Sequence, residues 1–518
     1  MLRAYKMVRD SPPLMRLIES IQTALDDHPG EKSSLTVHLF AVGICVMALA
    51  HPNDPMLMTF ITQVTAELPR DIAARLTAGR TFRRPTYRMM THLKKRLDDL
   101  PPVATTEAAP GPAGNSYGDG SGSLSNFQLL ADAILQASVP DLYRSRTRCR
   151  ATDSHSIHSY TRMRKLDEGT ANDGHHDPTD RDLDLAEDTP VATDSDTAEV
   201  IAAKDNWSTR DPEADWIHMP AKNGRRSFQT LGFYLHSTVL VPEEDRNDVP
   251  NLTTHVTLTT GASGYAAAAV SAIRTEQAQG HQVNELLVDQ GYSGKVASDF
   301  AIPLHKVGVR IVYDLPKQRE GYEPTRNNLG GAVIVDGDLF CPGAPFLDGL
   351  PRIPRNGKPQ SVADLNEAYN ARSVFRFGVR AYNIDEHGSC RAECPAKAGR
   401  AVCPIVETSN RLPLGTPAVL DVPEHPGLAC TQATITAPVT FASRRQKHAY
   451  GTTAHTKSKA RRTGVERSFA AATTLHGKLD RSTVRSCGIG IRTLLLAVKL
   501  AMGNLEAIDA WEHHHPAG

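Results

Sequence analysis

Three acidic residues, far apart in the 518-residue sequence, have the setting of metal-binding carboxylates: Asp153, Asp289 and Glu466. Asp153 follows the short run CRAT, and Asp289 lies between the apolar run ELLV and QGYSG, where glycine allows the chain to turn sharply. Two divalent ions about 3.5–4 Å apart, held by a few carboxylates, can activate an attacking oxygen and stabilise the leaving oxygen of a phosphodiester. A single aspartate at a strand end is more often a turn or cap residue. The metal hypothesis therefore requires all three acids to converge.

The residues around these acids predict a sheet that could bring them together. A strand is expected to end near Asp153, followed by strands over 231–242 and 254–260, a helix over 264–280, a strand ending at Asp289, a helix over 296–308 and a strand over 309–316. Two or three hairpin-like strands followed by α-β-α-β indicate the α/β class, with an RNase H-like mixed sheet flanked by helices. If the first strand is central, both aspartates leave the sheet at one edge. A later helix can then place Glu466 against them.

The remaining chain divides by composition. Residues 1–100 have apolar side chains at helical intervals and predict a helical N-terminal domain, which binds DNA or, alternatively, serves dimerisation or packing. Residues 101–124 are rich in Pro, Gly and Ala and predict a flexible linker. The catalytic core is expected over 125–316, with an acidic insertion at about 167–205, and resumes over 444–518 with a helical C-terminus. Between these two parts, 317–443 reads as an insertion that contains a cysteine cluster.

The neutral net charge hides an uneven distribution. Between Arg444 and Arg485 there are 11 Lys and Arg residues against two acids, Glu466 and Asp480. A local excess of this kind attracts phosphate, although a solvated helix face is the simpler alternative. The candidate DNA-binding residues are Lys295, Arg461, Arg462 and Arg467.

The cysteines suggest a second metal. The opening residues contain no secretion signal, so a disulfide framework is not expected. Four cysteines of the insertion are candidate ligands of a structural Zn²⁺, with unpaired thiols as the alternative: Cys390, Cys394, Cys403 and Cys430. Cys341, in LFCPG, could replace one of them.

Several motifs in order resemble one family. They are ATDSH around Asp153, DPEADW (211–216), LGFYLH (231–236), LLVDQGYS (286–293), TGVERSF (463–469) and TLLLAVKLAMGNL (493–505). Together they resemble the DDE-class transposases of bacterial insertion sequences, over roughly residues 125–505. The resemblance implies that Asp153, Asp289 and Glu466 bind two Mg²⁺ (or Mn²⁺) ions and catalyse DNA cleavage and strand transfer. It also implies recognition of terminal inverted repeats and of target DNA, and assembly as a homo-oligomer on DNA.

Other readings remain open at this point. An RNase H-like nuclease would cut DNA without joining it, and a catalytically decayed transposase would act only as a DNA-binding protein. A zinc-binding interaction module is a weaker alternative, because it leaves the sheet pattern and the carboxylates unexplained. No segment of the sequence has the roughly 20 apolar residues that a membrane span needs. The expected location is the cytoplasm, in association with the nucleoid, and no membrane partner is expected.

Overall fold

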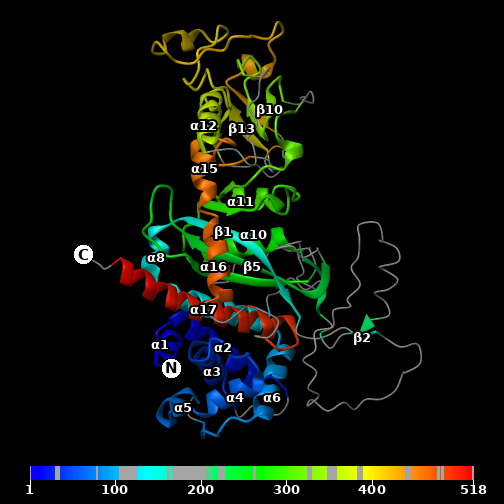
Figure 1. The fold of residues 1–518 in the computed structure, drawn as a ribbon, viewed down its shortest axis with the longest axis vertical. Coiled ribbons are helices and arrows are strands. Elements are labelled where there is room, and N and C mark those ends of the chain that lie inside the picture. Colours follow the sequence, from blue (N-terminus) through cyan, green and yellow to red (C-terminus); the bar gives the residue numbers. More distant parts are fainter. Residues whose placement is uncertain are drawn as a thin grey trace.

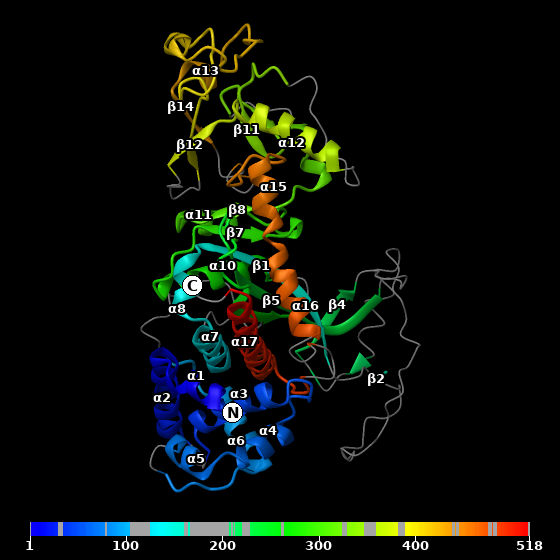
Figure 2. The same ribbon diagram turned by 60° about the vertical axis from the view of Figure 1, so that its left-hand side comes forward.

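The structure is a computed structural model, and it describes a large part of the chain. The described residues are 2–29, 35–77, 80–103, 125–159, 164–165, 207–208, 211, 213–219, 228–260, 264–323, 329–346, 359–381, 389–437, 441, 445–474, 479 and 484–515. The predicted acidic insertion at about 167–205 lies outside them, as does nearly all of the predicted linker 101–124. Along the long axis, the N-terminal helices are followed by two long helices, then the main sheet, and finally the cysteine-containing insertion (Figures 1 and 2).

The N-terminal residues fold into helices, as their periodicity predicts. The helices are α1 (Leu2–Arg9), α2 (Pro12–Asp27), α3 (Val37–Ala50), α4 (Met58–Ala66), α5 (Arg70–Leu76) and α6 (Tyr87–Asp99). Helix α3 is apolar on all sides and almost wholly buried, because α1, α2, α4 and α5 pack against it together with a helix from the end of the chain, α17 (Ile489–His514). Gly43 of α3 faces Thr65, and a Cβ there would lie 2.1 Å from Thr65 Oγ1. The missing side chain lets α3 and α4 pack closely.

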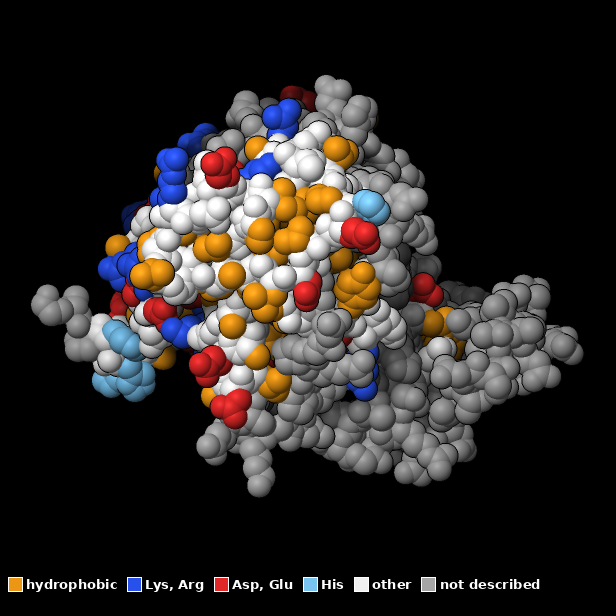
Figure 3. Space-filling view, turned by 90° about the horizontal axis from the view of Figure 1, so that it is seen from above, with side chains coloured by type: hydrophobic (Ala, Val, Ile, Leu, Met, Phe, Trp, Pro, Cys, Tyr) orange, Lys and Arg blue, Asp and Glu red, His pale blue; other side chains and the backbone are white. Residues whose placement is uncertain are grey.

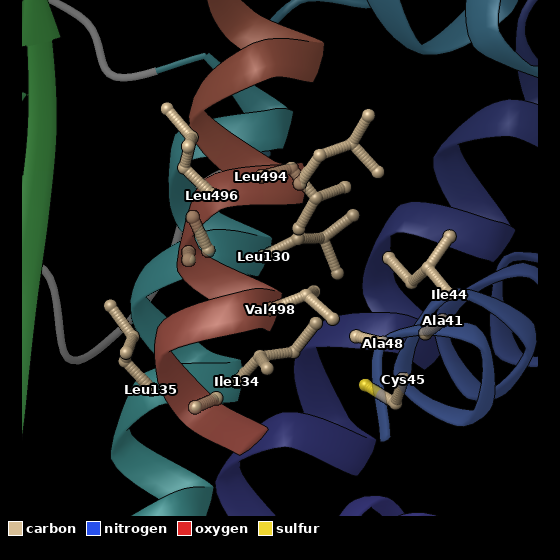
Figure 4. Close-up of a cluster of buried hydrophobic side chains, with 14 of the residues drawn as sticks. Ala41, Ile44, Cys45, Ala48, Leu130, Ile134, Leu135, Leu494, Leu496 and Val498 are labelled. Atoms are coloured by element: carbon tan, nitrogen blue, oxygen red, sulfur yellow. The ribbon is translucent and has the colours of Figure 1, made fainter. Parts of the chain in front are cut away.

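Two helices from distant parts of the sequence form the layer between this group and the sheet. They are α7 (Asn126–Ser138) and α17 (Ile489–His514). Figure 4 shows Leu130, Leu494 and Val498 pointing toward α3, whereas Leu135 and Leu496 lie on the other side. Both helices also contact a strand of the main sheet, so one continuous apolar core runs from the N-terminal helices to the sheet.

The main sheet is mixed. Its strands are β1 (Cys149–His158), β4 (Asp215–Met219), β5 (Phe228–Val241), β6 (Leu252–Thr259), β7 (Glu285–Val288) and β8 (Arg310–Val312). Strand β1 lies between β5, to which it is antiparallel, and β7, to which it is parallel. Strand β8 continues the parallel side, and β4 and β6 both pair with the far edge of β5. Helices α10 (Tyr265–Ala278) and α11 (Ala301–Lys306) connect the later strands. The predicted α/β class with a mixed sheet and flanking helices is therefore confirmed.

Strand β1 differs from the prediction at its end. It continues past Asp153 to His158, because the polar run DSHSIH pairs with β5 residue by residue, Asp153 opposite Ser237 and His158 opposite Gly232. Successive side chains of a strand point to opposite faces. Arg150 accordingly reaches α10 on one face, whereas Asp153 and His155 reach a helix on the other.

The helix that Asp153 and His155 reach belongs to an almost continuous pair, α15 (Thr453–Ala460) and α16 (Thr463–Thr474). In Figures 1 and 2 this pair runs from the insertion, past the sheet, to α17. Helix α15 contacts α12 (Pro359–Ser373) of the insertion and β8, and α16 contacts β1 and β5. Within the described residues, no helix combines the length and apolar character needed to cross a membrane.

The insertion contains two small sheets around a separate apolar core. One consists of β9 (Tyr322–Glu323), β10 (Val333–Val335) and β11 (Asp338–Phe340); the other consists of β12 (Gly378–Ala381), β13 (Cys390–Glu393) and β14 (Thr434–Ala437). A short helix, α13 (Leu428–Thr431), precedes β14. Figure 3 looks onto this end of the molecule and shows apolar side chains gathered near the middle of the face.

Candidate active site

The junction of α15 and α16 is anchored to the sheet by Arg461. Its guanidinium donates to Glu285 of β7 (2.7 Å), to the carbonyl of Pro242 after β5 (3.1 Å) and to the sulfur of Cys149 in β1 (3.2 Å). Ser458 of α15 donates to the same Glu285 carboxylate. Because these contacts join three neighbouring strands, they set where α16 begins relative to the sheet.

Close packing at Gly464 brings the first turn of α16 against the sheet. A Cβ at this position would lie 2.6 Å from Val241 Cγ1 and 2.7 Å from Asn251 Oδ1. On the next turn, Phe469 stacks on His155 of β1 with ring centroids 5.1 Å apart. Glycine is therefore required for α16 to lie where its acidic residue can reach β1.

The next residue, Arg462, joins two of the three predicted acids. Its Nη1 lies 2.8 Å from Asp153 Oδ2, and its Nη2 donates to Glu466 Oε1, one helical turn further along α16. The Asp153 and Arg462 side chains are only 18% and 19% exposed, whereas Glu466 is 52% exposed. The Arg462 guanidinium is thus paired with two carboxylates, one from strand β1 and one from helix α16.

The third acid, Asp289, lies directly after β7, where the chain turns into a short 3-10 helix. Its side chain caps that turn by accepting from the backbone N–H of Gln290, and the residue is exposed. Strand β7 is parallel to β1 in the main sheet. The negative charge of Asp289 acts on both Asp153 and Arg462. The structure therefore joins Asp153 and Glu466 through Arg462 and places Asp289 at the end of the neighbouring parallel strand.

The surroundings perturb the ionisation of Asp153 in particular. Its pKa is raised to about 6, chiefly by burial and also by the charges of Asp289 and Glu466, while the backbone N–H of Ser154 and the charge of Arg462 oppose the shift. A desolvated carboxyl group next to two like charges is typical of functional sites, although structural ion pairs also perturb pKa values.

An aromatic cluster lies beside Asp153. Tyr265, at the start of α10, lies 6.0 Å from Tyr292 between ring centroids, and Lys295 lies 4.8 Å above the Tyr265 ring. The hydroxyl of Tyr292 is buried and has no hydrogen-bond partner among the described residues. Burial, followed by the charges of Asp153 and Asp289, raises the pKa of Tyr292. The sequence reasoning missed Tyr265, because a tyrosine that opens an alanine-rich helix carries no signal of its own.

The four predicted DNA-binding residues have different environments. Arg467 is exposed on α16, and Lys295 is half-buried after β7. The donors of Arg461 and Arg462 are directed to carboxylates and other groups of the protein itself. Lys295 and Arg467 are therefore the better placed of the four to meet a phosphate.

The predicted cysteine ligands lie in the insertion, and all four are buried and free of disulfides. As the side chains stand, no group of three or more His, Cys, Asp or Glu residues among those described is arranged to hold a metal ion. This applies to the three acids, two of which Arg462 bridges, and to the cysteines.

The comparisons with known proteins provide no relative from which the function of the site could be inferred. No family model matches the chain, and no curated protein or solved structure matches it either.

Proposed function

We propose that the chain is a DDE-type transposase, which cleaves DNA at the ends of an insertion sequence and joins them to target DNA. The observation that carries the proposal is the pairing of Asp153 and Glu466 with the same Arg462, together with the position of Asp289 at the end of the strand parallel to β1. These residues come from a central strand, the end of its parallel neighbour and a helix more than 170 residues further along the chain. Residues so distant in sequence have no local reason to converge.

The sheet supports an RNase H-like reading of this site. Its strands run in the order β4, β5, β1, β7 and β8, with β6 also paired to β5, and pairing is antiparallel on one side of β1 and parallel on the other. This matches the two or three hairpin strands and the α-β-α-β continuation that the sequence predicts. The acids then lie on and beside the central strand, which carries helices on both faces.

The donor set suits hard divalent cations such as Mg²⁺, which bind carboxylate oxygens and retain water or phosphate oxygens in their other positions. Asp153, Asp289 and Glu466 would hold the ions, whose role is to activate the attacking oxygen and stabilise the leaving one. Arg462 already provides the positive charge that holds Asp153 and Glu466 near each other. It would have to release at least one of these carboxylates when ions bind.

The chain's own cations would position the DNA. Arg467 follows Glu466 on the exposed side of α16, and Lys295 follows Asp289 by six residues. Side chains on both sides of the acids can therefore contact phosphates that flank the cleaved bond, which supplies binding energy that depends on salt.

An assay of cleavage and joining tests the proposal. The full chain is incubated with Mg²⁺ or Mn²⁺, a target plasmid and labelled DNA that carries the sequences flanking its coding region. We expect nicked ends and labelled joined products from the native protein, and neither from Asp153→Asn, Asp289→Asn or Glu466→Gln. The matched control is Asp299→Asn, which removes an exposed carboxylate ten residues after Asp289.

Each alternative predicts a different result. Cleavage without joined products would identify a nuclease of the same architecture and overturn the transposase proposal. Binding of the flanking DNA without any metal-dependent cleavage would identify a DNA-binding protein. Equal activity of the native protein and the three variants would remove the proposed site altogether.

A further inference from the structure

Four cysteines reach the core of the insertion from separate segments of the chain. Cys341 follows β11, Cys394 follows β13, Cys403 begins the next turn, and Cys430 lies in α13. All four are less than 10% exposed and carry free thiols. Three of them, Cys341, Cys394 and Cys403, are packed in the same apolar cluster.

The same three cysteines stand at similar turns, each with proline as the following residue. In each turn a backbone N–H three or four residues later donates to the cysteine carbonyl: Ala344 to Cys341 (3.2 Å), Ala398 to Cys394 (2.9 Å) and Val406 to Cys403 (2.9 Å). These hydrogen bonds fix the backbone of each turn, and with it the direction in which the cysteine side chain leaves the chain.

Tertiary contacts hold these turns next to one another. Lys397, in the Cys394 turn, donates to the carbonyl of Thr431, which adjoins Cys430 (2.8 Å). Val402, which precedes Cys403, pairs with Ala418 in an isolated bridge. Gly343, in the Cys341 turn, packs so closely on the same stretch that a Cβ would lie 2.3 Å from the Asp421 carbonyl oxygen. These contacts, which do not involve the sulfurs, hold the segments that carry the four cysteines against one another.

We propose that Cys341, Cys394, Cys403 and Cys430 bind one structural zinc ion as four thiolates. On binding, each thiol gives its proton to solvent and its sulfur lone pair to the ion, so that no oxidant or reductant is needed. The thiols must close in on one another, because no three of the described ligating side chains yet have a metal-binding arrangement. A thiolate is unfavourable in an apolar core without a neighbouring positive charge. The charge of the bound ion would make the thiolate more stable than the neutral thiol.

This set contains Cys341 in place of Cys390, which the sequence spacing had suggested. Cys390 begins β13 and pairs with Ala437, and Cys394 directly follows this strand. Four residues of extended chain span about 13 Å. Two sulfurs bound to one zinc ion at about 2.3 Å each lie no more than about 4.6 Å apart. Cysteine side chains are too short to cover the remaining distance between Cys390 and Cys394, so these two residues do not bind the same ion.

Metal analysis of the purified full chain tests the proposal. The zinc content is measured after gel filtration, and the metal is then replaced by Co²⁺, whose thiolate charge-transfer and d–d absorption report a tetrahedral sulfur site. We expect about one zinc ion per chain and a cobalt spectrum typical of four thiolates. Each of the substitutions Cys341→Ser, Cys394→Ser, Cys403→Ser and Cys430→Ser should reduce the zinc content at least tenfold. The matched controls, Cys390→Ser and Cys45→Ser, change other buried cysteines and should retain the zinc.

Two outcomes would overturn the proposal. One is a native protein that binds neither Zn²⁺ nor Co²⁺ after reduction. The other is loss of zinc in Cys390→Ser together with its retention in Cys341→Ser. Because a variant that loses zinc may also fold poorly, the cobalt spectrum of the native protein and the protection of four thiols from alkylation by zinc provide a test without substitutions. The result is independent of DNA cleavage, so it does not decide the proposed function.

Discussion

At the scale of single residues, the site is built around Asp153, whose charge is held in a poorly solvated position. The three acids could be chosen from the sequence because each has a distinctive setting, and the Arg462–Glu466 pair is visible as an i,i+4 spacing on a helix. The contact between Arg462 and Asp153 could not be predicted. It depends on the rotation of α16 against β1, which is determined by the contacts of Arg461 and Gly464 with residues distant in sequence.

Asp153→Asn should abolish cleavage without destabilising the protein. The raised pKa of Asp153 means that the folded protein favours the neutral carboxyl group, so its contribution to stability is present below the unfolded-state pKa of 3.8 and is lost as the pH rises through about 6. Near pH 7 the charged form opposes folding, and a neutral amide removes this effect. Thermal unfolding should show an equal or higher Tm for the variant. A Tm several degrees lower would indicate a structural ion pair instead of an active-site acid.

The same ionisation predicts the pH dependence of cleavage. If ionised Asp153 is needed, the rate at saturating Mg²⁺ should fall as the pH decreases through about 6. Arg462 lowers the pKa of Asp153, so Arg462→Met should move this acid limb to higher pH in any activity that remains. Rate profiles between pH 5 and 8, at constant ionic strength, would measure both effects. A profile that is flat across this range would contradict the role given to Asp153.

At the scale of elements, helices and strands with clear apolar periodicity were predicted well, whereas the end of β1 and helix α12 were not. Strand β1 extends beyond Asp153 because β5 provides backbone hydrogen bonds to a polar segment that reads as a loop. Helix α12 lies in the insertion, where no helix was predicted because apolar side chains are sparse. In both cases tertiary pairing outweighs the local pattern.

Gly464→Ala should weaken catalysis by displacing α16. The new Cβ would meet Val241 and Asn251 at under 3 Å, so the helix start must shift away from β5 and carry Arg462 and Glu466 with it. We expect cleavage to fall at least tenfold while circular dichroism retains the native helix content. The control, Gly294→Ala, makes the same substitution where a Cβ meets no atom within 4 Å. Equal effects of the two substitutions would show that the placement of α16 is not critical.

The ion pair on the opposite face of β1 leads to a prediction about the stability of the protein. Arg150 and Glu276 form a fully buried ion pair between β1 and α10, with Thr254 donating to the same carboxylate. Burial alone would raise the pKa of Glu276, but Arg150 holds it at about 2. Stability from this pair is therefore present above the unfolded-state pKa of 4.5 and is lost as the pH falls toward 2.

Glu276→Ala should destabilise the protein by about 3–5 kcal/mol, because it leaves a buried arginine without its partner. Asp509→Ala, which removes an exposed ion pair with Arg3, should cost less than about 1 kcal/mol. Urea unfolding at pH 7 measures both free energies. Similar small losses for the two variants would show that the buried pair contributes little.

At the scale of the whole molecule, the N-terminal helices, the α7–α17 layer and the main sheet bury one another's apolar side chains. The N-terminal helices could be predicted, but their relation to the sheet could not, because α7 and α17 lie about 350 residues apart in sequence and form the shared layer only after folding. Leu130, Leu494 and Val498 are buried by α3 and its neighbours (Figure 4). The N-terminal residues therefore complete the core of the candidate catalytic part.

A fragment that begins at residue 101 should fold poorly for this reason. Removal of the N-terminal helices exposes the apolar sides of α7 and α17, which favours aggregation. We expect low solubility and binding of a hydrophobic dye, compared with the full chain at equal concentration. A soluble fragment that unfolds cooperatively at the same temperature as the full chain would show that the two parts are independent domains.

The most direct measurement of the central claim is iron-directed cleavage of the protein itself. Fe²⁺ bound in place of Mg²⁺ generates hydroxyl radicals with ascorbate and peroxide, and these cut the backbone close to the ion. The account predicts cuts near residues 153, 289 and 466 together, suppressed by excess Mg²⁺ and absent from Asp153→Asn. Cuts near only one of these positions, or a pattern unchanged by Mg²⁺ and by the substitution, would show that the three carboxylates do not share their ions.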